Sequence, residues 1–174
     1  MPRSPILAGE EALASRINNA LDDVGRTVHQ TTEPIRNNQT SYLDSTSLVL
    51  PVEANATYVL NSLIVYDSAT AADIKIRFSL PAGGSARLAK WGQDVGATGV
   101  SGSINVSVSD DVADVVEFTY GGLGVGTMVS AKPSGLIIVG GTAGNVTVGF
   151  AQNTANASVT TLRLGSSMSL ARAA

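Results

Sequence analysis

The sequence predicts a mainly β protein: an antiparallel β-sandwich of the jelly-roll kind, preceded by a short N-terminal arm and one amphipathic α-helix. After residue 40, apolar and polar residues alternate in short segments that are separated by turns rich in Gly and Asn. The chain holds 18 Gly and is 44% hydrophobic, but it is only 5% aromatic. We therefore expect a core of Val, Leu, Ile and Ala built from many short strands.

The composition bounds the class of protein. At 174 residues, the chain can bury the core of one ordinary domain without disulfides or metals. Its net charge is −3, whereas a nucleic-acid-binding domain needs a basic surface that displaces counterions from phosphates. No apolar run approaches the roughly 18 residues of a membrane span, and the N-terminus lacks the apolar stretch of a secretory signal. We expect no nucleic-acid binding and no membrane insertion.

The N-terminal segment differs from the rest of the chain. Pro2 and Pro5 favour an extended arm over residues 1–9, and from Glu10 the apolar residues recur at spacings of three and four until Gly25. A helix this short is marginal alone, so its apolar stripe needs a partner surface. The arm and the stripe together offer six apolar side chains for docking: Ile6, Leu7, Leu13, Ile17, Leu21 and Val24.

A polar segment, Arg26 to Asn38, follows the helix and contains Pro34. It shows neither the helical nor the strand period clearly, which indicates a linker or an irregular strand. We therefore divide the chain into an arm, helix and linker over residues 1–40 and a β-sandwich over residues 41–174.

The strands follow in order from this boundary. Two are expected on either side of the turn "EANA", and the second, over residues 58–66, is apolar on both faces. The segment "ADIKIRFSL" alternates cleanly, which places Ile74, Ile76, Phe78 and Leu80 inward. The segment "GGLGVGT" is expected to be a flexible connection. Further strands are predicted in "SARLAKWGQD", "SINVSVSDD", "VVEFTYGG", "SGLIIVGG" and "NVTVGFAQ".

The closing stretch "LRLGSSMSL" predicts one half-buried strand with an unusual outer face. Leu162, Leu164, Met168 and Leu170 alternate with residues that are almost all small and uncharged. Such a face associates with other surfaces unless it is covered, so we expect a homo-oligomer. The residues assigned to this subunit interface are Val159, Thr161, Gly165, Ser167 and Ser169.

No pattern in the sequence predicts catalysis, a cofactor or a metal. His29 is the only histidine, and it lies in the polar segment without a nearby Cys or paired carboxylates. Asp110, Asp111 and Asp114 lack the spacing of a calcium loop, so a solvated acidic turn is the expected interpretation. The Gly-rich stretches have neither the phosphate-loop register nor a following helix.

Trp91 could serve a binding function. A lone Trp in a strand pattern is typical of the core, but an exposed ring could stack on a sugar of the host surface. Tyr66 and Tyr120 are alternative stacking platforms for such a carbohydrate-binding module. A polysaccharide hydrolase is a further alternative; it would need paired carboxylates, for which Glu117 near the acidic turn is the candidate.

Several motifs resemble those of small virion proteins from tailed phages of actinobacteria, often labelled minor tail proteins. The resemblance implies a non-enzymatic structural protein on the virion surface, made in the bacterial cytoplasm and trimeric. Its partners would be other copies of itself, tail or major capsid proteins, and a host glycan; a capsid decoration or head fibre protein is the alternative. The matching segments are Val52 to Tyr58, Tyr66 to Lys75, Pro81 to Gly83, Ala151 to Thr160 and Leu170 to Arg172.

Overall fold

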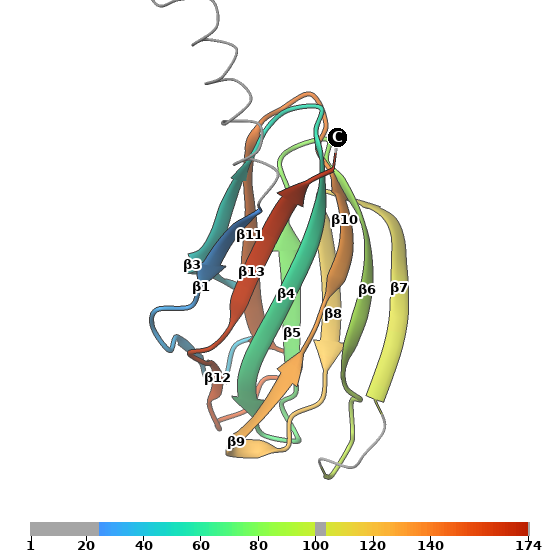
Figure 1. Ribbon diagram of the computed structural model, residues 1–174. Coiled ribbons are helices and arrows are strands. Elements are labelled where there is room, and N and C mark those ends of the chain that lie inside the picture. Colours follow the sequence, from blue (N-terminus) through green and yellow to red (C-terminus); the bar gives the residue numbers. More distant parts are fainter. Residues whose placement is uncertain (1–24, 100–103, 174) are drawn as a thin grey trace, which may run out of the picture.

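A computed structural model describes residues 25–99 and 104–173 as two antiparallel sheets that face each other in a β-sandwich (Figure 1). The prediction of a mainly β, antiparallel fold is confirmed. The helix expected from Glu10, with its docking residues, lies outside the described residues. The part of the chain that is described contains no α-helix, and none there could span a membrane.

The large sheet has nine strands, and β4 (Thr57–Ser68) organises it. The first half of β4 lies between β13 and β10, and its second half lies between β12 and β9. The sheet continues outward from β13 to β1 and from β10 to β6 and β7. Besides β4, its strands are β1 (Arg26–His29), β2 (Ile35–Arg36), β6 (Ser85–Gln93), β7 (Ile104–Ala113), β9 (Gly124–Ala131), β10 (Ser134–Ile138), β12 (Thr160–Leu162) and β13 (Ser167–Arg172).

The small sheet has four strands in the order β3-β11-β5-β8. The expected alternation in β5 is confirmed, since Ile74, Ile76 and Phe78 are fully buried. These side chains meet Leu60, Ile64 and other residues from the large sheet in one apolar core. The strands are β3 (Leu43–Val52), β5 (Ile74–Ser79), β8 (Val115–Tyr120) and β11 (Gly144–Gln152).

For Arg26 to Asn38, the sequence indicates either a linker or an irregular strand, and the structure shows strands, because β1 pairs with β13 and β2 pairs with β12. Two local predictions are wrong. The stretch "GGLGVGT" is no flexible connection, because it contributes the first half of β9.

The second wrong prediction is the single strand over "LRLGSSMSL". The chain forms β12, turns, and returns as β13, because Gly165 takes a φ of 90° that a β-strand does not have. The turn puts Leu164 out of the core, and it is 52% exposed. Met168 and Leu170 are buried as expected.

The sandwich has two distinct ends. Arg26 pairs with Leu170, and the amide of Ala173 donates to the carbonyl of Thr57, so the described chain begins and closes at one end. The start of β9 lies at the opposite end (Figure 1). Residues 1–24 therefore join the sandwich at the end far from β9.

Candidate functional site

The outer face of the large sheet is the most unusual surface of the described molecule. The strand registers place residues of β1, β13, β4, β10 and β6 side by side on it, in rows that cross the sheet. We call this surface the open face. Its rows are His29, Ser167 and Leu63; Thr27, Ser169, Asn61, Ser134 and Ala89; and Ala171, Val59, Leu136 and Arg87.

The open face is apolar or small over most of its area. Val59, Leu63 and Leu136 are between 37% and 40% exposed, which is high for large apolar side chains in central strands. Serines and alanines lie between them, so a partner surface could approach the backbone closely. Val59 and Leu136 are neighbours, and Leu63 lies beyond the row that contains Asn61. Exposed apolar side chains on a sheet surface with few charges favour an interaction site.

The outer face of the small sheet has the opposite character. Arg77 pairs with Asp44 at 2.8 Å. Lys75 and Arg77 also lie over the ring of Tyr42, at 5.0 and 4.5 Å from its centroid. Charged groups that are paired and partly exposed are typical of a surface that faces water. The contrast between the two faces singles out the open face as the candidate interface.

An ion pair between Arg163 and the buried Asp67 lies beside the open face, near the start of β13. The side chain of Asp67 is fully buried, and Arg163 donates to its Oδ2 from two guanidinium nitrogens. Arg163 also pairs with Glu33 at 2.9 Å, and these two acidic partners raise the pKa of its guanidinium. The amide of Gly126 donates to the same oxygen of Asp67 at 2.8 Å. This cluster ties β4 and β9 to the turn before β13.

The structure places the five predicted interface residues differently. Ser167 and Ser169 lie on the open face, and Gly165 is exposed in the turn beside it. Val159 is half-buried. Thr161 is only 4% exposed because it pairs with Ile35 and Asp67, so it offers little surface to a partner.

The sequence reasoning missed the part of the open face that β4 and β10 supply. Val59, Leu63 and Leu136 were not assigned to an interface. The signal was present, because residues 58–66 are apolar on both faces although a sandwich strand normally buries only one.

The expectation that Trp91 belongs to the core is wrong. Its side chain is 53% exposed and borders a groove of about 360 Å³ between β6 and β9. Tyr66 and Tyr120 are fully buried instead, so neither can serve as a stacking platform. Burial raises the pKa of both tyrosines above the ordinary value.

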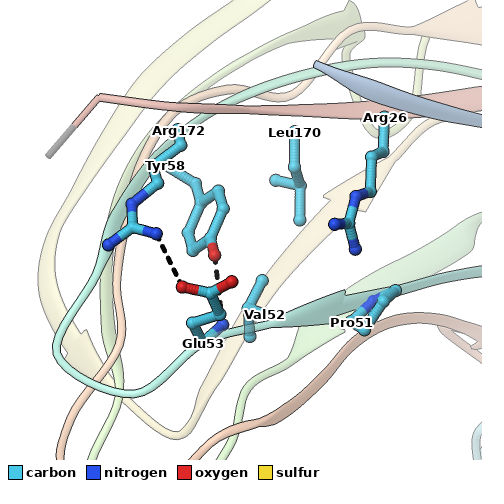
Figure 2. A pocket seen from close by; sticks show the side chains of 7 residues that line it. All are labelled: Arg26, Pro51, Val52, Glu53, Tyr58, Leu170 and Arg172. Atoms are coloured by element: carbon cyan, nitrogen blue, oxygen red, sulfur yellow. Dashed lines mark hydrogen bonds and ion pairs between the residues drawn. The ribbon is translucent and has the colours of Figure 1, made fainter. Parts of the chain in front are cut away.

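A second, smaller pocket of about 90 Å³ lies where the described chain begins and closes (Figure 2). Arg172 pairs with Glu53 at 2.6 Å, and the hydroxyl of Tyr58 accepts from the amide of Glu53 at 3.1 Å. Arg26 lines the opposite side of the pocket, beside the apolar side chains of Leu170, Pro51 and Val52. The pocket is large enough for a few water molecules, and its polar groups pair mainly with one another.

The remaining candidate residues do not converge on one site. His29 is exposed on β1, Glu117 is exposed on β8, and Asp114 is exposed at the turn before β8. Within residues 25–99 and 104–173, no group of three or more His, Asp or Glu side chains is arranged to hold a metal ion.

No known protein family and no curated protein matches the sequence. Among solved structures, the VP2 subviral particle of infectious bursal disease virus is a weak neighbour, with 10% identity, a TM-score of 0.26, and coverage of 85% of this chain and 41% of that one. The T13 particle of the same virus gives 12% identity, a TM-score of 0.24, and coverage of 85% and 38%. These weak neighbours are viral capsid proteins, and the chain spans about two fifths of their length.

Proposed function

We propose that this protein is a non-enzymatic structural component of a phage particle, of the minor tail or fibre type. It is made in the bacterial cytoplasm and displayed on the particle surface as a homotrimer. The observation that carries the proposal is the open face: a nearly uncharged sheet surface opposite a sheet surface of paired charges. The motifs shared with small virion proteins of actinobacterial phages supply the setting.

The open face suits contact between identical copies. Leu63 and Val59 offer apolar area, while Ser167, Ser169 and Ala171 let another backbone approach. Obligate interfaces between identical subunits are more apolar than ordinary surfaces. We assign the trimer contact to this face.

The two ends of the sandwich fit an attached and displayed component. Residues 1–24 join the described chain at Gly25, at the end that also carries Arg172. In this proposal, they dock on the tail or capsid, and the end that carries β9 faces outward. Gold labelling of the protein on intact particles distinguishes a tail fibre from the alternative, a capsid decoration or head fibre protein.

The mass of the protein in solution tests the trimer. We expect light scattering to give three times the chain mass for the unaltered protein and the monomer mass for Leu63→Arg, because a charged side chain cannot be buried unpaired in the contact. Val115→Arg is the matched control, since Val115 is also 40% exposed but lies on β8 in the small sheet.

The control should remain trimeric, and both variants should keep the β circular dichroism of the unaltered protein. A monomeric unaltered protein would refute the trimer. A Leu63→Arg variant that stays trimeric would move the contact to another surface.

A further inference from the structure

A fork in the large sheet creates the groove beside Trp91. β10 fills the space between β4 and β6 as far as the pair Ser134–Ala89. Beyond it, β9 pairs with β4, and the amide of Lys132 donates to the carbonyl of Trp91 at 2.7 Å. The groove lies next to this bond and is bordered by the end of β6 on one side and by β9 on the other.

The backbone fixes Trp91 at the rim of this groove. Its carbonyl is held by Lys132, and its neighbour Gly92 lies so close to the ring of Tyr120 that a Cβ atom there would stand 2.5 Å from the ring. These contacts hold the backbone of the strand on its inner side, and the indole projects outward from it. A rigid exposed aromatic side chain is a good binding platform, because little conformational entropy is lost when a ligand stacks on it.

The lining of the groove combines apolar and polar groups. Met128 is 63% exposed and supplies a second apolar surface. Ser130 supplies a hydroxyl, and Lys132 supplies an ammonium group. Gln93 also lines the groove, but it is only 8% exposed and its amide nitrogen already donates to the carbonyl of Gly99 at 3.4 Å. Lys132 has no ion-pair partner among the described residues, and the lining contains no carboxylate. The groove thus offers an aromatic face, a hydroxyl group and one uncompensated positive charge.

We propose that this groove binds an acidic glycan, a sugar that carries a carboxylate or a phosphate. The sugar ring stacks on Trp91, one of its hydroxyls bonds to Ser130, and its anionic group pairs with Lys132. The volume of about 360 Å³ is in the range of small-ligand sites. The absence of acid from the lining favours an anionic ligand over a neutral one.

The groove adjoins the proposed trimer contact on the outer side of the large sheet. Trp91 follows Ala89 on β6, and the pair Ile64–Ala131 places Lys132 beside Leu63. The proposed glycan site rests on neither the virion role nor the trimer, although a trimer contact at Leu63 would lie at the rim of the groove.

A glycan array tests the ligand class with the full-length protein. The array carries uronate-bearing glycans, phosphate-bearing glycans and their neutral counterparts. We expect binding to the acidic glycans only, and the uronate and phosphate spots show which anion is preferred. Absence of binding to every spot, or equal binding to the neutral counterparts, would overturn the proposal.

The fluorescence of Trp91 then locates the site. It is the single Trp of the chain, so a change in its emission on titration with the strongest array ligand reports contact at this groove directly. We expect Trp91→Ala to weaken binding about tenfold or more in calorimetry, and Trp91→Phe, which keeps a flat ring, to retain most of it. Lys132→Gln should weaken binding severalfold and abolish its dependence on salt.

Val115→Ala is the control, because Val115 is an exposed apolar residue on the small sheet. It should bind as the unaltered protein does, and all variants should melt at the same temperature. Unchanged emission on binding, or full binding by Trp91→Ala, would place the ligand elsewhere and overturn the proposal. A monomeric protein that binds the glycan would refute the trimer and leave this site intact.

Discussion

At the scale of single residues, the stability of the fold depends on how the buried negative charge of Asp67 is compensated. Its carboxylate is fully buried, and its Oδ1 has no hydrogen-bond partner among the described residues. Only Arg163 and the amide of Gly126 compensate its charge, through Oδ2. A buried carboxylate that loses its cation is strongly destabilising, because water cannot replace the partner.

We predict that Arg163→Met lowers the free energy of unfolding by about 3 to 5 kcal/mol. Arg172→Met is the matched control: Arg172 and Glu53 are 39% and 59% exposed, so the loss of their pair should cost about 0 to 1 kcal/mol. Adding Asp67→Asn to Arg163→Met should restore most of the loss, since a neutral amide can still accept from Gly126. Urea unfolding measures all three, and equal losses for the two arginine variants would contradict the argument.

Trp91 shows why single residues are hard to place from sequence. Ala86, Leu88 and Lys90 share the inner side of β6, so the strand period puts Trp91 outside. The inner position of Lys90 hides this pattern, because a lysine is normally a sign of the outer face. Lys90 is nevertheless buried, its ammonium donates to the carbonyl of Thr119 at 3.0 Å, and burial lowers its pKa.

At the scale of elements, β10 is the strand that holds the middle of the large sheet together. It pairs with β4 on one side and β6 on the other, so the backbone hydrogen bonds along both of its edges must be intact. Gly135, its second residue, has a φ of 150°, and a Cβ atom there would overlap the carbonyl oxygen of Arg87. This position therefore requires glycine for both backbone conformation and space.

We predict that Gly135→Ala destabilises the fold by about 2 to 4 kcal/mol, from backbone strain and the displacement of β6. Gly141→Ala is the control. The φ of Gly141 is not positive, so alanine can adopt the same backbone conformation, and no atom lies within 4 Å of a Cβ atom placed there. Thermal melts compare the two variants. Similar melting temperatures would show that β6 can shift without cost.

Strands with clear alternation, such as β5 and β7, could be predicted from sequence, but turns that depend on backbone conformation could not. The residues around Gly165 keep the apolar period of one strand, and only the φ of Gly165 reveals the turn between β12 and β13. In β9, glycines hide a strand because its pairing comes from β4 rather than from its own side chains. Ser167 and Ser169 could be placed on the outer side of their strand because its period is clear, whereas the rest of the open face comes from β4 and β10, in distant parts of the chain.

At the scale of the whole molecule, the described sandwich begins with β1, which starts at Arg26. β1 contributes to the core as well as to the edge of the sheet, because Val28 packs on the core. Directly after β1, Gln30 accepts from the hydroxyl of Ser45 at 2.7 Å, a bond that joins the two sheets. We therefore expect the boundary of the fold to lie just before Arg26.

We predict that a chain lacking residues 1–24 keeps the β circular dichroism and melting temperature of the unaltered protein but no longer joins assembled particles. A chain lacking residues 1–30 is the matched comparison, and it should melt lower because it also loses β1 and the Gln30–Ser45 bond. Immunoblots of purified particles measure incorporation. If the shorter deletion unfolds the protein, residues 1–24 belong to the core; if that variant still enters particles, the attachment surface lies on the sandwich, and the open face becomes the first candidate for it.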